Sequence, residues 1–434
     1  MSAILLIKNG RILDPASGFD QTSDILIKDG RIVEIRDGIE IPTELQSESI
    51  DARGLIVVPG FIDIHTHLRE PGFEHKETIA TGAEAAAAGG FTSIACMANT
   101  RPVNDSTEIT GLILRKAREA GLLARVYPIA AITIGLQGKT LSPMKALKDA
   151  GAVAFSDDGS PVSDDSIMEL ALEAGKRLGV PIISHCETRE LAHGGVMNEG
   201  PFSRRLGLKG IPNESEDRMA ERDIRLAGKT GGHVHIAHVS TAGTVQLVRD
   251  AKRAGIKVTC EAAPHHFTLS DEDVSRDNPN TKMNPPLRSW RDVDAVLEGL
   301  ADGTIDAIAT DHAPHSQEEK ARGFEEAPFG IVGLETALPL VLSLVRDKVI
   351  SLNRAISLMA FLPAKIMGLD KGRLRVGDEA DLAVFDPERE WTVDPASFKS
   401  KGKNTPFVGW KVKGKVCFTI AGGKIVYRER AQIK

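Results

Sequence analysis

Between residues 56 and 365, short apolar segments alternate with longer amphipathic ones. The amphipathic segments, such as KETIATGAEAAAAGG and DDSIMELALEAGKRLG, have a helical period, whereas the apolar ones have the length of strands. Strands that alternate with helices form a parallel sheet, and eight such units close into a barrel. The eight expected strands lie near 57–67, 91–98, 125–132, 152–157, 181–186, 233–239, 256–262 and 305–310. We therefore predict an α/β fold with a (β/α)8 TIM barrel over residues 56–365.

The two ends of the chain show a different pattern, in which short β-like runs are separated by tight turns. Asn9-Gly10 and Asp29-Gly30 lie between such runs, and both dipeptides favour two-residue hairpin turns. The C-terminal region alternates in the same way. We predict that residues 1–55 and 366–434 join in one small antiparallel β-sandwich domain packed against the barrel.

Composition and charge argue against two classes of function. The 434-residue chain has a formal net charge of −6 and no basic block, which argues against a nucleic-acid partner. No apolar run reaches the roughly 18 residues that a membrane helix needs, and the first residues lack the features of a signal peptide. The four cysteines are far apart and form no CxxC pair, so we expect reduced thiols in a cytoplasmic protein.

Polar residues gather at the ends of the predicted strands, where a barrel carries its chemistry. Side chains two apart on a strand share a face, so Asp63, His65, His67 and Arg69 are expected to point the same way. An HxH pair is half of a transition-metal site, although alone it is equally well explained as two surface histidines. The other polar residues at these strand ends are Asn99, Asp157, Asp158, His185, His238 and Asp311. Four histidines and up to three aspartates on one rim predict a metal site.

The remaining histidines have plainer explanations. Strict alternation places His233 and His235 on the opposite face from His238, so we expect them to face the helix layer in structural roles. For His265 and His266, a place in the pocket and a packing or capping role are equally good predictions. Three more residues are expected not to be ligands: the loop residues His75 and His193, and the buried thiol Cys186.

Several segments taken in order resemble a known family. These are PGFIDIHTHLREPG, HCE, HVS, MNPPLR, ATDHAPH and the tail GDEADLAVFDP. They resemble the amidohydrolase superfamily, and within it the bacterial class I dihydroorotases, over nearly the whole chain. The resemblance implies a zinc-dependent enzyme that reversibly cyclises N-carbamoyl-L-aspartate to L-dihydroorotate in pyrimidine (UMP) biosynthesis. It implies one or two Zn²⁺ ions per chain, held by His65, His67, Asp158, His185, His238 and Asp311.

The predicted fourth strand separates the subgroups of this family. Hydantoinases and allantoinases carry a carboxylated Lys there, whereas GAVAFSDDGSPV contains none. Class I dihydroorotases bridge their metals with an Asp, and the family's spacing to His185 assigns that role to Asp158 rather than Asp157. A hydantoinase- or allantoinase-type cyclic amide hydrolase is the first alternative. The second, a non-catalytic partner of aspartate transcarbamoylase, is disfavoured because all six ligands are present.

The resemblance also implies how the substrate is held. Asp311 would carry a proton between the attacking water and the ring nitrogen. Arg69, Asn99 and His315 would bind the carboxylate that does not react, and a rim salt bridge is the alternative role for Arg69. The ring amides would contact Asn284 and the backbone of Phe329 and Gly330.

Residues 311–330, DHAPHSQEEKARGFEEAPFG, carry charge and glycine with little apolar periodicity. We predict a mobile active-site loop here, and an exposed connector without a catalytic role is the alternative. We also expect a homo-oligomer. Assembly with aspartate transcarbamoylase, which some class I dihydroorotases show, is left open by the sequence.

Overall fold

A computed structural model describes residues 4–41, 47–121 and 123–429. Eight strands pair in parallel, in the order β15-β14-β13-β10-β9-β8-β7-β6. They are β6 (Phe61–Thr66), β7 (Phe91–Cys96), β8 (Arg125–Ala130), β9 (Ala154–Ser156), β10 (Ile182–Ser184), β13 (Val234–Ile236), β14 (Val258–Ala262) and β15 (Ala307–Ile308). Thr66 bridges His312, and the His67 N–H donates to the His312 carbonyl over 2.8 Å. These contacts join the two ends of the order, so the predicted (β/α)8 barrel is confirmed.

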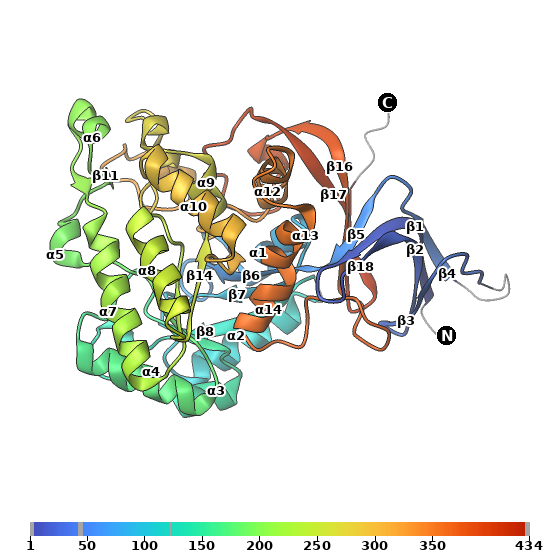
Figure 1. Ribbon diagram of the computed structural model, residues 1–434, viewed down its shortest axis with the longest axis horizontal. Helices are drawn as coiled ribbons and strands as arrows, with labels where there is room; N and C mark the ends of the chain where they lie inside the picture. The colour runs from blue at the N-terminus through green and yellow to red at the C-terminus, as the bar shows by residue number, and fades with distance from the viewer. Residues whose placement is uncertain (1–3, 42–46, 122, 430–434) are drawn as a thin grey trace.

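Helices follow the strands and cover the outside of the barrel (Figure 1). The main ones are α1 (Ile79–Ala88), α2 (Thr107–Glu119), α3 (Met144–Ala150), α4 (Asp165–Leu178), α7 (Glu214–Thr230), α8 (Ala242–Arg253) and α10 (Trp290–Asp302). After β15 come α12 (Ala337–Arg346), α13 (Leu352–Ile356), the π-helical turn η4 (Ser357–Phe361) and α14 (Leu362–Ile366). Shorter elements in the loops are η1 (Ile134–Leu136), α5 (Arg189–Ala192), β11 (Met197–Asn198), α6 (Pro201–Leu206), β12 (Gly210–Ile211), α9 (Pro264–Thr268), η2 (Asp271–Asp273), η3 (Pro279–Thr281) and α11 (Gln317–Lys320).

Helix α4 shows how the sequence forms these outer elements. Asp164 caps its first turn, because the carboxylate accepts hydrogen bonds from the Ser166 and Ile167 N–H groups at 2.7 and 3.1 Å. Its apolar stripe, which includes Met168 and Leu172, is buried against the barrel. Full burial of such side chains stabilises a fold by about 1.5–3 kcal/mol each. The helix ends at a glycine in the left-handed conformation, which residues with a Cβ rarely adopt.

Strands from both ends of the chain form a second sheet, which lies beside the barrel (Figure 1). Its order is β18-β17-β16-β5-β1-β2-β3, and β4 pairs with β1. The strands are β1 (Ile4–Asp14), β2 (Phe19–Lys28), β3 (Arg31–Arg36), β4 (Ser47–Asp51), β5 (Ile56–Pro59), β16 (Leu382–Thr392), β17 (Lys411–Ala421) and β18 (Lys424–Arg428), with η5 (Pro395–Ser397) between β16 and β17. This sheet has its own buried cluster, which joins N-terminal isoleucines to Leu382, Val384 and Ile420. A small β-domain built from both ends is therefore present, as predicted.

One of the two predicted hairpins is wrong. Asp29 and Gly30 both have positive φ and join β2 to β3, as a two-residue turn requires. Asn9 and Gly10 instead lie inside β1, at an irregularity in its pairing with β2. Asn9 has φ 60°, its N–H donates to Asp24 Oδ1 over 2.8 Å, and the strand continues past it. Tertiary pairing has made a bulge from a dipeptide that locally favours a turn.

The segment expected as one strand over 57–67 is divided between the two sheets. β5 pairs with β1 and β16, whereas β6 pairs with β7 in the barrel. Gly60 lies between them, and a Cβ there would come within 2.3 Å of the Thr92 side chain. Only a glycine allows the backbone this close approach, so the chain passes directly from one sheet into the other.

No helix among the described residues is both long and apolar enough to span a bilayer.

Candidate metal centre and active site

Six predicted ligands meet at the C-terminal ends of the barrel strands. His65 lies in β6, and the others lie one to three residues beyond the ends of β6, β9, β10, β13 and β15. All are buried, with at most 6% of the residue surface exposed. They are His65, His67, Asp158, His185, His238 and Asp311.

Asp158 lies at the centre of this group. Its Oδ1 is 3.6 Å from His65 Nε2, 3.5 Å from His185 Nδ1 and 3.7 Å from His238 Nε2. Its Oδ2 is 3.5 Å from His67 Nε2. One carboxylate therefore faces four imidazoles, a set of donors close enough together to hold a metal ion.

Asp311 contacts the two histidines that come from β6 and its end. Its Oδ1 lies 3.1 Å from His67 Nε2 and 3.5 Å from His65 Nε2. The residue has φ 48°, a left-handed turn directly after β15 that directs the carboxylate to the cluster. Two sets of three groups are each close enough to share one ion: His65, Asp158 and His238, and His65, His67 and Asp311.

The donor atoms fit a transition metal. His65 Nε2 and Asp158 Oδ1 are buried and have no hydrogen-bond partner among the described residues, which is costly unless a ligand satisfies them. Two ligands of a tetrahedral zinc ion, each about 2.0–2.2 Å from the metal, lie about 3.3 Å apart. The spacings of 3.1–3.7 Å around Asp158 and Asp311 are close to this value.

The charges in the group also favour a cation. Burial acts to raise the pKa of Asp158, but contacts with His185 and His238 outweigh it and hold that pKa well below its usual range. Burial likewise opposes ionisation of Asp311, but its hydrogen bond with His67 and the charge on His65 lower its pKa. Both carboxylates are therefore ionised at neutral pH.

Asp157, the alternative to Asp158, points elsewhere. Its Oδ1 accepts the backbone N–H groups of Ile132 and Thr133 at 2.7 and 3.0 Å, and its Oδ2 accepts the Thr133 hydroxyl. Burial raises its pKa to about 6, which these hydrogen bonds oppose. Asp157 therefore stabilises the loop after β8. Of the two aspartates, only Asp158 lies in the cluster.

His65 contacts a buried carboxylate that the sequence analysis did not identify. Glu261, in β14, has Oε1 2.6 Å from His65 Nδ1 and Oε2 3.2 Å from His235 Nε2. Its pKa is lowered to about 2, because the His65 and His235 contacts outweigh the burial that would raise it. A glutamate within a buried apolar strand was the signal that could have identified it.

The prediction that His235 faces the helix layer is wrong. His235 is fully buried and contacts Glu261 inside the barrel, whereas Val234 and Ile236 pack in the cluster formed with the helices. His238 reaches the site because β13 has ended at Ile236 and His238 takes a left-handed φ of 32°. Alternation along a strand therefore fails once the strand has ended. His233 and His235 both bond to the Thr259 hydroxyl at 2.8 Å, so each has a structural partner.

A cavity of about 230 Å³ opens directly over the cluster. It is lined by most of the predicted ligands and by every residue predicted to bind substrate, and no other cavity described here contains them. The residues predicted for substrate that line it are Arg69, Asn99, Asn284, His315, Phe329 and Gly330.

Arg69 reaches this cavity by a route that strand alternation did not predict. β6 ends at Thr66, and Arg69 has φ 62°, so the shared face of the strand does not extend to it. Its Nε donates to the Pro314 carbonyl over 3.1 Å, and its Nη2 lies 3.2 Å from His315 Nε2. Arg69 is partly exposed, and no carboxylate lies within ion-pair distance of its guanidinium, so the rim salt bridge proposed as the alternative is absent from the described residues.

His315 is held as a neutral imidazole. Burial and the nearby Arg69 and Lys76 charges lower its pKa strongly. The Lys76 ammonium is 3.3 Å from Nδ1, so we place the proton on Nε2, which donates to the Phe329 carbonyl over 2.8 Å. Arg69, His315 and the Phe329 backbone thus form one wall of the cavity.

Asn99 and Asn284 bond to the cluster from opposite sides. Asn99 Oδ1 is 2.9 Å from His67 Nδ1, and its Nδ2 donates to Asp158 Oδ2 over 3.2 Å. Asn284 Nδ2 donates to Glu187 Oε2 over 2.7 Å and lies 3.4 Å from His185 Nε2. Glu187 is a second residue that the sequence analysis missed, although it belongs to the HCE segment.

The other histidines and Cys186 stay outside the cluster. His266 Nε2 donates to the Pro285 carbonyl over 2.9 Å, a structural role, and His265 is buried beside it without lining the cavity. The exposed and core positions predicted for His75, His193 and Cys186 are those observed.

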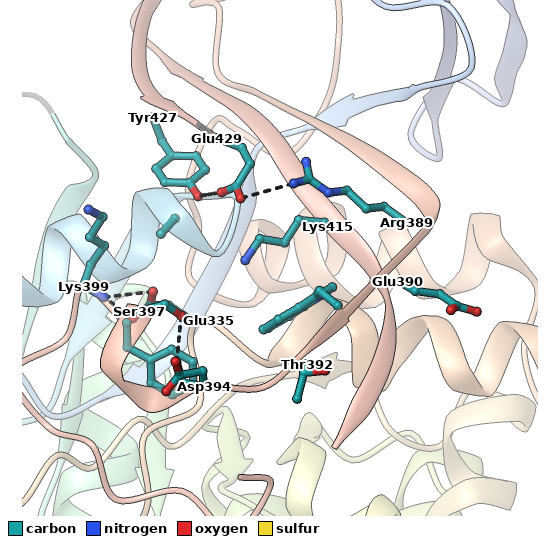
Figure 2. A pocket seen from close by; sticks show the side chains of 13 residues that line it. Glu335, Arg389, Glu390, Thr392, Asp394, Ser397, Lys399, Lys415, Tyr427 and Glu429 are labelled. Atoms are coloured by element: carbon teal, nitrogen blue, oxygen red, sulfur yellow. Dashed lines mark hydrogen bonds and ion pairs between the residues drawn. The ribbon is translucent and has the colours of Figure 1, made fainter. Parts of the chain in front are cut away.

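A larger cavity, of about 530 Å³, lies between the terminal sheet, helix α1 and the loop after β16, and contains none of the predicted ligands (Figure 2). Several of its charged groups have partners within the protein: Arg389 lies 3.6 Å from Glu429, and Glu335 accepts backbone N–H groups of Lys399 and Ser400. We therefore place the chemistry in the smaller cavity.

Comparisons with known sequences identify the family of this chain. A family model described as Dihydro-orotase-like matches residues 54–244, and one described as Amidohydrolase family matches residues 209–427. A dihydroorotase of Geobacter metallireducens is 53% identical over 424 residues, 98% of this chain and 99% of the relative. A dihydroorotase of Syntrophus aciditrophicus is 51% identical over 426 residues, 98% of this chain and 99% of the relative.

Solved structures show the same architecture. The L-hydantoinase (dihydropyrimidinase) of Arthrobacter aurescens has a TM-score of 0.87 at 27% identity, with 98% of this chain and 96% of that chain covered. A D-hydantoinase (dihydropyrimidinase) of Thermus sp. has a TM-score of 0.82 at 27% identity, with 98% and 95% covered. Amidohydrolases generally bind metals, as the cluster described above is built to do. The identity over almost the full length is decisive: this chain belongs to the dihydroorotase family of the amidohydrolases.

Proposed function

We propose that this chain is a zinc-dependent dihydroorotase (EC 3.5.2.3), which reversibly cyclises N-carbamoyl-L-aspartate to L-dihydroorotate in pyrimidine (UMP) biosynthesis. One observation carries the proposal. The cavity over the metal-binding cluster also contains Arg69, a partly buried guanidinium without a carboxylate partner among the described residues. A substrate carboxylate supplies that partner and leaves the rest of the ring over the cluster.

One or two zinc ions would be held by the six clustered residues, with Asp158 shared between two ions if both are bound. When bound, zinc lowers the pKa of a water ligand towards about 7 and polarises a carbonyl group. The cluster supplies nitrogen and carboxylate oxygen donors, the set that zinc prefers.

Asp311 is the proton carrier in this proposal. Its carboxylate is ionised and faces the cluster, so in the direction of ring opening it can accept the proton of the attacking water. It then gives that proton to the ring nitrogen as the amide bond breaks. In the direction of ring closure, Asp311 takes the proton from the ureido nitrogen as that nitrogen attacks the carboxyl carbon. It then gives the proton to the departing carboxyl oxygen, which leaves as water when the C–O bond breaks.

The remaining residues of the cavity orient the substrate. Arg69, Asn99 and His315 bind its spectator carboxylate, and because His315 is neutral, its role is to donate a hydrogen bond from Nε2 rather than to supply charge. Asn284 and the backbone of Phe329 and Gly330 contact the ring amides.

The test is a comparison of substrates by protein with measured zinc content. Cyclisation of carbamoyl-aspartate and opening of dihydroorotate should exceed ring opening of hydantoin and allantoin, and the activity should scale with zinc per chain. Hydantoinase activity is the second candidate, which the structural similarity to hydantoinases favours. A preference for hydantoin would reject our proposal. A protein that binds zinc but turns over none of these substrates would instead be the non-catalytic relative, which the complete ligand cluster argues against.

We also propose a cytoplasmic location, a homo-oligomeric state and the capacity to assemble with aspartate transcarbamoylase. The four free cysteines support the first of these. Light scattering of the purified chain, alone and mixed with aspartate transcarbamoylase, tests the other two.

A further inference from the structure

The connection between two C-terminal strands of the terminal sheet, β16 and β17, extends to the rim of the active site. It comprises residues 393–410, between the end of β16 and the start of β17. Phe398 and Phe407 anchor it, since both are buried in a cluster with Ile331 and Val332. We call residues 393–410 the rim segment.

Hydrogen bonds fix the base of the rim segment to the barrel (Figure 2). The Glu335 carboxylate accepts the Lys399 N–H at 2.8 Å and the Ser400 N–H at 3.1 Å. The Ser400 hydroxyl donates to Glu77, a buried carboxylate 3.3 Å from His312. The base of the segment therefore bonds to a carboxylate that itself contacts His312, the residue after Asp311.

Asn404 connects the rim segment to two active-site loops. Its Oδ1 accepts the His315 N–H at 3.0 Å, and its Nδ2 donates to the Ala313 and Gly330 carbonyls at 3.0 and 3.1 Å. Its own carbonyl accepts the Val332 N–H at 2.9 Å. A carboxamide has two N–H donors and one acceptor oxygen, and this side chain, 4% exposed, uses all of them.

The two loops carry the wall of the cavity that contacts Arg69. The first carries Pro314, whose carbonyl accepts from Arg69, and His315; the second carries Phe329, whose carbonyl accepts from His315, and Gly330. Asn404 does not line the cavity. It can affect a substrate only by holding these loops at a fixed separation.

We propose that Asn404 is a positioning residue, which sets the geometry of the substrate-carboxylate pocket by holding residues 313–315 and residue 330 together. The proposal rests on the function proposed above. Asn404 lies between two strands of the terminal β-domain, yet under this proposal it controls substrate affinity in the barrel. The proposal assigns it no effect on the metal cluster or on Asp311.

The test separates substrate binding from chemistry. Asn404→Asp keeps the size of the side chain but places an oxygen where the Ala313 and Gly330 carbonyls need a donor. We expect the KM for dihydroorotate to rise about tenfold, while kcat stays within about threefold and the zinc content is unchanged. A KM equal to that of the wild type, or a loss of kcat in parallel with KM, would overturn the proposal.

Two further variants make the outcome specific. Asp394→Ala removes a cap in the same rim segment, the 2.9 Å bond to the Ala396 N–H, and should leave KM unchanged. Gly402→Ala keeps the chemistry of Asn404, but its new Cβ would come within 2.6 Å of Pro314 Cβ and 2.9 Å of Asn404 Oδ1, so it would disturb the contact between Asn404 and the first loop. It should raise KM as Asn404→Asp does, and it decides the question if that variant does not fold. Failure of the proposed function is distinct, because the wild type would then not turn over dihydroorotate at all.

Discussion

Replacement of Glu261 by Gln probes how the barrel interior prepares the metal site. Glu261 contacts His65 Nδ1 at 2.6 Å, so the other ring nitrogen, Nε2, is left free to face the cluster. The carboxylate holds the tautomer and orientation of His65, and His235 holds the carboxylate from the opposite side at 3.2 Å. Glu261→Gln keeps the shape of the side chain and an oxygen acceptor but removes the charge.

The size of the effect follows from the change in hydrogen-bond type. A hydrogen bond to a charged group contributes about 1.5–3 kcal/mol, and one between neutral groups about 0.5–1.5 kcal/mol. The difference of about 1–1.5 kcal/mol corresponds to an affinity for zinc about tenfold lower. This lies within the range of about 10–100-fold found when the partner of a metal-ligating histidine is changed.

The assay is competition for zinc between metal-free protein and a chelator of known affinity. Asp292→Asn is a matched control, because Asp292 is a buried carboxylate with hydrogen bonds to Asn213 and Ala242, away from the cluster. It should leave the zinc affinity unchanged. Zinc affinity equal to that of the wild type in Glu261→Gln would refute the reasoning that this carboxylate orients His65.

Three further predictions concern the proton carrier, the carboxylate pocket and a buried acid. At saturating zinc, where the other five residues would still hold the metal, Asp311→Asn should keep its zinc content yet lose about 10²–10⁴-fold in turnover, because an amide cannot carry the proton; turnover like that of the wild type at equal zinc content would remove Asp311 from this role. Arg69→Lys should raise the KM for dihydroorotate about tenfold, the equivalent of about 1.4 kcal/mol for one lost charge-assisted hydrogen bond, whereas Arg53→Lys, at an exposed pair with Asp51, should not. Burial raises the pKa of Glu335 from 4.5 to about 7, so the folded state favours the protonated acid. The contribution of this group to the free energy of unfolding is therefore fully present below pH 4.5 and is lost as the pH rises through 7. Glu335→Gln does not titrate and so does not lose this stability. The melting temperature of the variant minus that of the wild type should therefore be larger at pH 8 than at pH 5. The same difference at both pH values would contradict the burial argument.

The sequence by itself determined the barrel and most of the cluster. Alternating strands and helices specify a closed parallel sheet, and the ends of its strands must share one rim. His65, His67, His185, His238 and Asp311 could therefore be grouped from their places at strand ends, while the choice of Asp158 over Asp157 needed the family resemblance. The assigned metal and substrate roles remain predictions, and so do the boundaries of the two domains. The mobility of residues 311–330 also remains a prediction; within this segment, Lys320 donates hydrogen bonds to three carbonyls.

Tertiary structure decided what local patterns could not. Asn9-Gly10 became a bulge because β1 continues along β2, and Arg69 and His238 reach the site through left-handed residues beyond the strands, where alternation no longer applies. Glu261 and Asn404 escaped the sequence analysis because their partners lie far away in the chain: 196 residues separate Glu261 from His65, and 89 separate Asn404 from His315. Periodicity reports which face of an element is buried, but only the packed chain brings such distant groups within hydrogen-bonding distance.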